Sequence, residues 1–355
     1  MTSRWRSCGR WDASQRPEVG ALHHLQILDV GGNNLEEIPP EIGTLQDLQV
    51  LDIGCNLKDL PTCIGSLSRL VRLNLGGNHL MEVPTSIRPL QNLQNLSIAN
   101  NGLQELPSWI GSFPRLRELY AGRNEFTGLP PEIGDLAALE TLVITNGRLA
   151  RLPPTISRLK SLRRLNLENN QLMELPDAIG DLSNLEDLNV EHNLLEILPE
   201  TLGNLHNLTH IDLGYNHLRT LPESIGNLAR LKQLRAIFNK LEELPASIGN
   251  LPQLEVLDLR GNNIVRSHKC YPATITRLRA LKHLWLQYPD DWQTKSTPPW
   301  DVIYAWLLAL DKQGCHVIDP PDFLFPEYYD DPEDDNDDAF YEDDDNDDDN
   351  DVNEN

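Results

Sequence analysis

Residues with the chemistry of a catalytic or metal site are few in this sequence and mostly isolated. The single histidines include His79, His192, His210 and His217. His268 and Cys270 lie close together, but two potential ligands supply only half of an ordinary zinc site. HExxH and GxSxG motifs are absent, and no glycine-rich phosphate loop follows a predicted strand. We therefore expect no enzyme activity, no metal ion and no cofactor.

A motif of 23 residues accounts for most of the remaining pattern. The stretch Leu162–Asn184 has the skeleton L-x-x-L-x-L-x-x-N-x-L-x-x-L-P-x-x-I-G-x-L-x-x, and this skeleton returns along the chain. Complete copies start at Leu25, Leu48, Leu70, Leu93, Leu116, Leu139, Leu162, Leu185, Leu208, Leu231 and Leu254, and a degenerate twelfth starts at Leu281. The second copy loses one residue around Asn56-Leu57, and the eleventh gains four. Repetition with this period is typical of a leucine-rich-repeat solenoid.

Each half of the repeat predicts one structural element. The L-x-L core predicts a short strand whose leucines point inward, so that stacked repeats form one parallel sheet. The proline of the L-P step fixes φ and ends the strand. The few residues after it have room only for 3₁₀ or single helical turns. We therefore predict an α/β solenoid, a horseshoe with a parallel sheet on its concave side and short turns on its convex side.

The ninth position of the repeat predicts a ladder of buried amides. It is asparagine in ten of the eleven complete repeats, and the alignment places Asn56 there in the second repeat. A buried amide at the bend after each strand satisfies backbone groups that would otherwise each cost about 1–3 kcal/mol. Gly147 is the exception, so we expect a gap in the ladder at that repeat.

The pattern divides the chain into four regions. Residues 1–16 match no repeat; we expect a disordered arm, which either covers the open end of the core or marks a truncated form of a longer array. The repeat array covers residues 17–288, and stacking should stop where Pro289 replaces the expected asparagine. Residues 289–318 predict a helical cap, and residues 319–355 predict a disordered acidic tail.

The predicted cap contains one amphipathic helix. Thr297 suits the N-cap, the two prolines after it suit the first turn, and Gly314 suits the C′ position after Gln313. Apolar residues recur on one face at helical spacing, namely Ile303, Trp306, Leu307 and Leu310. We interpret this helix as a cover for the last repeat, and the alternative is a helix that binds a partner.

Negative charge is concentrated in the tail. Residues 319–355 contain 19 acidic and no basic residues, which leaves 35 acidic and 30 basic residues for the rest of the chain. The body lacks the basic surface that nucleic acid requires, so direct nucleic-acid binding is not expected. The five cysteines are an odd number without CxxC spacing, which favours a reducing compartment.

Neither a membrane span nor a secretion signal is predicted. The N-terminal residues lack an apolar run of the signal-peptide type. The longest nearly apolar run, Val302–Leu310, has nine residues and is too short to cross a bilayer. We expect a monomer in the cytoplasm, with the nucleus as the alternative location.

The variable positions of the concave strands are the predicted binding surface. They are small or weakly polar in the first four repeats and become large and chemically distinct from the fifth onward. Because aromatic and arginine side chains dominate interface energies, Tyr120, Tyr215, Arg235, Phe238 and Trp285 are the predicted anchors. For Phe238 the alternative is that the ring folds back onto a neighbour. The predicted protein-binding surface comprises Glu118, Tyr120, Arg123, Val143, Arg164, Asn166, Glu168, Asp187, Asn189, Glu191, His210, Asp212, Tyr215, Arg235, Ile237, Phe238, Arg260 and Trp285.

The repeat also carries a family resemblance. The form L-P-x-x-I-G-x-L-x-x-L-x-x-L-x-L-x-x-N-x-L, repeated across residues 17–288, resembles the intracellular Ras-group leucine-rich-repeat proteins. These include a scaffold between Ras-type GTPases and a protein phosphatase, and the Scribble/Erbin polarity proteins. The resemblance implies a noncatalytic scaffold in signal transduction whose concave face binds a small GTPase, a protein phosphatase or another signalling protein.

The acidic tail supports a second hypothesis, a nuclear protein that binds histones or other basic clients. Aromatic residues among the charges would then serve as anchors, namely Tyr328, Tyr329, Phe340 and Tyr341. The other interpretations are a solvated polyanion and a tail that folds back on the basic residues Arg266 and Lys269.

Deletion of residues 319–355 distinguishes the two hypotheses. Under the scaffold hypothesis, the shortened chain captures the same partners as the full chain, since the binding surface lies in the array. Binding through the tail would disappear on deletion, and in the full chain it would weaken steeply as salt rises, because exposed charges are screened. Affinity capture with both chains at low and high salt measures this difference.

Overall fold

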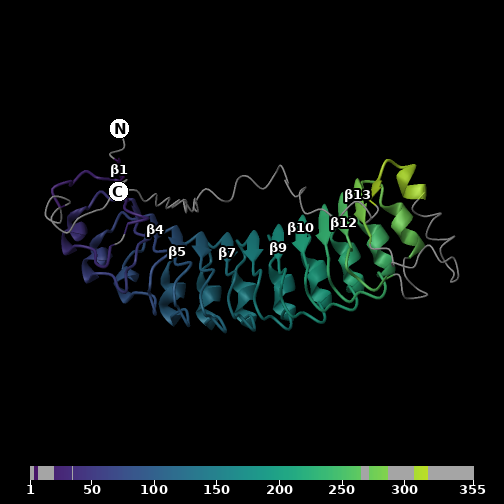
Figure 1. The fold of residues 1–355 in the computed structure, drawn as a ribbon, viewed down its shortest axis with the longest axis horizontal. Helices are drawn as coiled ribbons and strands as arrows, with labels where there is room; N and C mark the ends of the chain where they lie inside the picture. Colours follow the sequence, from purple (N-terminus) through teal and green to yellow (C-terminus); the bar gives the residue numbers. More distant parts are fainter. Residues whose placement is uncertain (1–3, 7–19, 34, 265–271, 287–307, 319–355) are drawn as a thin grey trace, which may run out of the picture. The chain divides into compact units, whose positions relative to one another are not determined.

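The repeats form one continuous parallel sheet with a row of short turns along its other side (Figure 1). The computed structural model describes residues 4–6, 20–33, 35–264, 272–286 and 308–318. These belong to one compact unit, residues 1–319, whereas the second unit, residues 320–355, lies outside the described residues. Within the described part, no helix is long and apolar enough to cross a bilayer.

The sheet of the described residues has 14 strands in the order of the sequence, each three residues long. The strands are β1 Arg4–Arg6, β2 Ile27–Asp29, β3 Val50–Asp52, β4 Arg72–Asn74, β5 Asn95–Ser97, β6 Glu118–Tyr120, β7 Thr141–Val143, β8 Arg164–Asn166, β9 Asp187–Asn189, β10 His210–Asp212, β11 Gln233–Arg235, β12 Val256–Asp258, β13 His283–Trp285 and β14 His316–Ile318. In neighbouring strands, residues at the same position of the repeat pair with each other, as Leu165 does with Leu188. The predicted solenoid with a parallel sheet is confirmed.

The return segment of each repeat is a 3₁₀ turn, as predicted. The turns are η2 Pro40–Thr44, η3 Thr62–Ser66, η4 Thr85–Ile87, η5 Ser108–Ser112, η6 Pro131–Asp135, η7 Pro154–Arg158, η8 Asp177–Asp181, η9 Glu200–Asn204, η10 Glu223–Asn227, η11 Ala246–Asn250 and η13 Ala273–Arg277. In η8, the N-cap Pro176 is extended (φ −66°, ψ 149°) and Ile179 is buried. Gly180 lies so near the Thr201 carbonyl of the next turn that a Cβ atom there would collide with it. Glycine therefore permits successive turns to pack closely.

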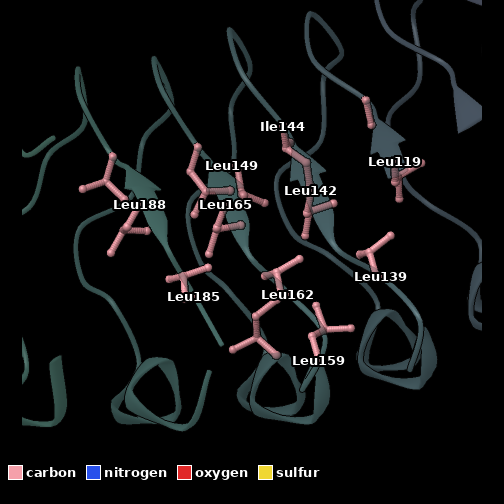
Figure 2. Packing of buried hydrophobic residues seen from close by; sticks show 14 of the residues in the cluster. Leu119, Leu139, Leu142, Ile144, Leu149, Leu159, Leu162, Leu165, Leu185 and Leu188 are labelled. Carbon is pink, nitrogen blue, oxygen red and sulfur yellow. The ribbon is translucent and has the colours of Figure 1, made fainter. Parts of the chain in front are cut away.

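The hydrophobic core lies between the sheet and the turns and is shared by all the repeats. Leu142, Leu165 and Leu188, the middle residues of three successive strands, are fully buried and lie in a row (Figure 2). Leu162 and Leu185 extend the same cluster toward the turns (Figure 2). No repeat encloses a core of its own, because each buries its leucines against the repeats on either side.

The predicted amide ladder links each repeat to the one before it. Asn193 Nδ2 donates to the Leu167 carbonyl of the preceding repeat (2.9 Å) and to the Val190 carbonyl of its own (3.0 Å). Asn193 Oδ1 accepts from the Leu172 amide (3.0 Å). The residue is 4% exposed. The same bonds recur at Asn124, Asn170, Asn216, Asn239 and Asn262.

The predicted gap in the ladder is present at Gly147. It removes one hydrogen-bond acceptor but does not interrupt the stacking of the repeats. In the register of the ladder, an Oδ1 atom at this position would accept from the Phe126 amide, and glycine has none to offer. The adjacent Ile144 carbonyl still accepts from Asn170 (2.6 Å). Strand β7 of the same repeat pairs with a strand on each side. The sheet therefore continues through the gap.

In the second repeat the structure corrects the predicted ladder residue. Asn78 Oδ1 accepts from the amides of Cys55 (3.0 Å) and Leu57 (2.9 Å), which places Cys55 and not Asn56 at the ladder position. The buried Cys55 thiol lies 3.1 Å from the Val30 carbonyl, the group that an asparagine would reach. Burial raises the pKa of the Cys55 thiol, so the thiol keeps the proton it donates. The prediction was wrong because the missing residue precedes the ladder position.

A strand that the motif does not identify begins the sheet. β1 pairs with β2 as Arg4 with Ile27, one repeat length of 23 residues apart. Trp5 stands at the leucine position of this strand, which explains why the leucine pattern fails to locate it. The rest of the predicted arm, residues 1–3 and 7–16, lies outside the described residues.

The sheet also continues past Pro289, so the expected end of stacking was wrong. β14 pairs with β13, as Val317 does with Leu284. The chain returns to the sheet at Gly314, which has φ of 87° and donates to the Asp311 carbonyl (2.8 Å). A left-handed glycine of this kind ends a helix and reverses the chain, which a motif centred on asparagine does not reveal.

The segment just before β14 contributes to the core. Residues 308–311 are helical, and Leu310 and Cys315 are buried in the shared cluster. The Cys315 amide donates to the Leu310 carbonyl (3.1 Å), which completes a Schellman motif with Gly314 at C′. The predicted helix before residue 308 lies outside the described residues, as do His268 and Cys270.

Asn193→Ala is expected to lower the free energy of unfolding by about 1–3 kcal/mol, because the buried Leu172 amide loses its acceptor. Chemical denaturation followed by circular dichroism measures the loss. Asn33→Ala is the matched control, since Asn33 is half-buried and its described bonds reach carbonyls of its own repeat, those of Val30 and Gly31. An equal loss in both variants would contradict a stabilising role for bonds between repeats.

Candidate protein-binding surface

The predicted surface residues lie on the face of the sheet opposite the core, here the sheet face. Along strands β2 to β13 the middle residue is buried and its two neighbours are more exposed, as in β8 and β9. The eighteen predicted residues are all described, but they do not form one site. Strand β6, with Tyr120, is five strands from β11, with Arg235. Because neighbouring strands lie about 4.8 Å apart, roughly 24 Å separates these two predicted anchors.

The eighth position of the repeat carries an unusual backbone conformation. Seven successive repeats place a non-glycine residue there with φ between 48° and 55°, namely Asn100, Arg123, Asn146, Asn169, His192, Tyr215 and Phe238. Asparagine tolerates this left-handed region, whereas for bulky residues it is exceptional. The conformation costs roughly 1–2 kcal/mol per residue in an L-amino acid. Tyr215 and Phe238 therefore adopt it against their intrinsic preference.

Three of these side chains form an aromatic stack of His192, Tyr215 and Phe238. The His192 and Tyr215 rings lie 4.0 Å apart between centroids, and the Tyr215 and Phe238 rings 4.7 Å apart. A Cβ atom at Gly261 would lie 2.6 Å from Phe238 Cδ1, so glycine makes room for the last ring. Tyr215 is 38% and Phe238 54% exposed. Phe238 thus does pack on a neighbour, yet more than half of it remains accessible.

The energies indicate that the fold does not require this stack. An aromatic pair contributes about 0.5–1.5 kcal/mol, whereas each left-handed ring-bearing residue costs roughly 1–2 kcal/mol. Stacking therefore does not clearly offset the strain at Tyr215 and Phe238. Glycine fits the same position in other repeats, as at Gly77 and Gly261. Backbone strain that does not stabilise the core indicates a functional role for the strained residues.

Beside the stack lies a carboxylate cluster of Glu168, Glu191 and Asp212. Burial, with the nearby charges of Asp212 and Glu168, raises the pKa of Glu191 to about 7, although Arg235 acts in the opposite direction. Burial also raises the pKa of Asp212. Glu191 Oε1 is 4.0 Å from His192 Nε2, which connects the cluster to the stack. Burial, and after it the neighbouring acids, therefore disfavour the ionised form of Glu191.

Gly214 joins the cluster to an apolar residue. A Cβ atom at Gly214 would lie 3.0 Å from Ile237 Cγ1, 3.1 Å from Asp212 Oδ1 and 3.3 Å from Glu191 Cγ. The missing side chain leaves room for these three residues around Gly214, the residue before Tyr215. Exposed rings, half-buried Ile237 and partly buried carboxylates thus share one area on repeats eight to ten.

Two arginines on this face already have acidic partners. Arg260 binds Asp258 through Nε (2.9 Å) and Nη2 (2.5 Å), and its guanidinium lies 5.7 Å from the centre of the Trp285 ring. Arg235 Nη1 is 3.9 Å from Asp212 Oδ2. These contacts orient both arginine side chains within the array.

Some predicted residues have a local structural role. The oxygens of Asn166, Asn189 and Asp212 accept from the backbone amide two residues later, at 3.0, 2.9 and 2.9 Å. This bond shapes the bend after the strand, as short polar side chains commonly do. Glu118 Oε2 of β6 accepts from Tyr120 of the same strand and from Asn95 of β5. The remaining predicted residues, Arg123, Val143, Arg164, Asp187 and His210, also lie on the sheet face.

His192 belongs to the aromatic stack; the repeat places it at an outward variable position, but the predicted binding residues did not include it, nor did they include Gly214 and Gly261. The available signal was the run of imidazole, phenol and phenyl rings at the eighth position of three successive repeats. The sequence does not show that this position is left-handed, so the run had no obvious significance. Among the described residues no three His, Cys, Asp or Glu side chains are arranged so that they could hold a metal ion, and Cys55, Cys63 and Cys315 are free thiols.

Comparison with known proteins identifies the family. The model described as "Leucine-rich repeat region" matches residues 5–81 and 110–193, and "Leucine Rich Repeat" matches residues 92–113 and 207–228. A leucine-rich-repeat protein of Leptospira interrogans is 33% identical with a TM-score of 0.75, and the match covers 85% of this chain and 74% of that protein. The chain belongs to the leucine-rich repeat family. Membership of the Ras group stays a prediction.

Other members of the family share the architecture more distantly. The plant peptide hormone receptor RGFR1, solved in complex with RGF2, is 30% identical with a TM-score of 0.65. That match covers 76% of this chain but 45% of the receptor. An internalin of Listeria monocytogenes is 20% identical with a TM-score of 0.57, over 79% of this chain and 86% of the internalin, and this likeness concerns the fold alone. No curated protein matches the chain.

Phe238→Gly is expected to change the free energy of unfolding by less than about 1 kcal/mol. The lost stacking is balanced by relief of the left-handed strain. Leu234→Ala in the same repeat removes a fully buried side chain and should cost about 2–5 kcal/mol. Chemical denaturation compares the two variants. A loss in Phe238→Gly as large as in Leu234→Ala would show that the ring belongs to the core.

Proposed function

We propose that this leucine-rich repeat protein is a noncatalytic scaffold in signal transduction that binds a protein partner on the sheet face. The observation that carries the proposal is the exposed, strained aromatic stack on repeats eight to ten. Aromatic side chains held rigidly at a surface are typical interface anchors. The fold gains little from them, and a binding role accounts for their cost.

The family supports binding of protein or peptide ligands by such arrays. RGFR1 is described in complex with RGF2, and PEPR1 is described with AtPEP1. For this chain we propose a small GTPase or a protein phosphatase as the partner, since the motif resembles the Ras group. The free thiols Cys55, Cys63 and Cys315 support a reducing cytoplasmic location. We propose that the protein acts there as a monomer.

A Tyr120→Ala/Arg235→Ala/Phe238→Ala variant is expected to lose most of the partner that the wild-type chain captures. The three substitutions remove anchors from both parts of the sheet face. Affinity purification followed by quantitative mass spectrometry measures the recovered partners. Arg158→Ala is the control, because Arg158 lies in η7 on the opposite side and pairs with Asp135 in solvent.

Equal recovery of the same partners by the triple variant and the wild type would refute the sheet-face assignment. Circular dichroism and denaturation of each variant confirm that a loss of capture reflects the surface and not the fold. A partner loss in Arg158→Ala alone would place the interface among the turns instead.

A further inference from the structure

The aromatic stack and the carboxylate cluster together specify the chemistry of a ligand. The stack offers an exposed apolar surface of fixed geometry, since both faces of Tyr215 are covered by neighbouring rings. Glu191 and Asp212 lie next to it around Gly214. A ligand that covers the rings therefore comes close to partly buried carboxylates.

Charge on this part of the sheet face is unbalanced. Repeats seven to eleven place five acids on it, Glu168, Asp187, Glu191, Asp212 and Asp258, against three arginines, Arg164, Arg235 and Arg260. The Arg260 guanidinium is held by Asp258. Arg235 lies nearest to the cluster, yet the pKa of Glu191 remains raised to about 7 in its presence. Another cation at this place would stabilise the carboxylates, whereas an anion would be repelled.

We infer that the stack and the cluster bind a segment of the protein partner that carries a lysine or arginine side chain beside an apolar residue. The apolar residue packs on the exposed edges of Tyr215 and Phe238, and the cationic group faces Glu191 and Asp212. This inference rests on the proposed function and names the partner's chemistry. Residues 319–355 of the chain itself are acidic and do not match this site.

The arrangement gives both affinity and selectivity. Covering the rings removes apolar surface from water, which contributes about 25 cal/mol per Å² of buried area. The carboxylates lie in a partly buried setting where a charge pair is screened less than on an open surface. A purely apolar segment would cover the rings but add no counter-charge beyond that of Arg235. A basic residue next to an apolar one satisfies both parts.

A random twelve-residue peptide library displayed on phage provides the probe, selected on the full-length chain. We expect the selected peptides to share a lysine or arginine next to an aromatic or aliphatic residue. Their affinity as synthetic peptides is measured by isothermal titration calorimetry. Selected peptides that compete for the stack but lack a basic residue would overturn the inference.

Charge reversal at the cluster provides the direct test. Glu191→Lys is expected to weaken the selected peptides at least tenfold at pH 8, and Phe238→Gly by a similar factor. Asp181→Lys is the matched control, because Asp181 is an exposed acid in η8, on the opposite side of the array and outside the predicted surface. It should change the affinity less than twofold. Unchanged affinity in Glu191→Lys contradicts the inference.

The pH dependence adds a signature that a merely structural role would not produce. With a pKa of about 7, Glu191 is mostly protonated at pH 6 and mostly ionised at pH 8. A cationic ligand favours the ionised form, so affinity should rise about tenfold from pH 6 to pH 8. The groups that face Glu191 are Glu168, Asp212, Arg235 and His192. In Glu191→Gln the rise should shrink to the part that Asp212 contributes, since burial also raises the pKa of that carboxyl; an undiminished rise contradicts the inference.

Glu191→Gln also controls for folding. Because the pKa of Glu191 is raised in the folded state, ionisation of this carboxyl lowers the stability of the wild-type protein as the pH rises through about 7. Glu191→Gln removes this ionisation, so the variant should be at least as stable as the wild type at pH 8. The triple variant of the preceding section separates the two proposals. If it loses the captured partner while Glu191→Lys retains the peptides, the scaffold function stands and the basic-residue inference falls. If it retains the partner, the proposed function itself falls.

Discussion

The hydrogen bonds of the buried asparagine ladder are the constraint on which the rest of the structure depends. Each side-chain amide bonds a carbonyl and a backbone amide of the preceding repeat and a carbonyl of its own, as Asn193 does with Leu167, Leu172 and Val190. Each strand ends in a bend of fixed geometry, and the residue before the ladder asparagine is held at positive φ, as is Asn146 before Gly147. In a solenoid every repeat contacts only its neighbours, so this local geometry recurs along the array.

The same constraint creates the surface on which function depends. The left-handed position is required by the bend, whatever residue occupies it. Glycine or asparagine occupies it with little strain, as at Gly77 and Asn169. Tyr215 and Phe238 occupy it with strain, and their rings are consequently presented outward in a rigid stack. A conformation imposed for stability thus becomes a way to display large side chains without adding mobile loops.

Departures from the motif show where pattern and backbone geometry diverge. In the second repeat, Cys55 takes the ladder position because its thiol reaches the same carbonyl as an amide would. At the ends, β1 uses Trp5 at the leucine position, and β14 follows a left-handed glycine at Gly314. Sheet pairing depends on backbone register and needs no leucine or asparagine at a given place. The array is therefore longer than its recognisable motif.

The sequence by itself determined the repeat length, the parallel sheet, the 3₁₀ turns and the gap at Gly147, because these follow from periodicity and from proline and asparagine chemistry. It also placed Tyr215, Phe238 and Glu191 among the outward residues. Only the tertiary structure decided that His192 stacks on Tyr215 and that Glu191 is crowded by Asp212. These contacts join residues of successive repeats, and their distances depend on the spacing of strands and on the left-handed bend. A one-dimensional pattern shows which face a residue occupies, whereas the packed backbone determines which neighbour it meets there.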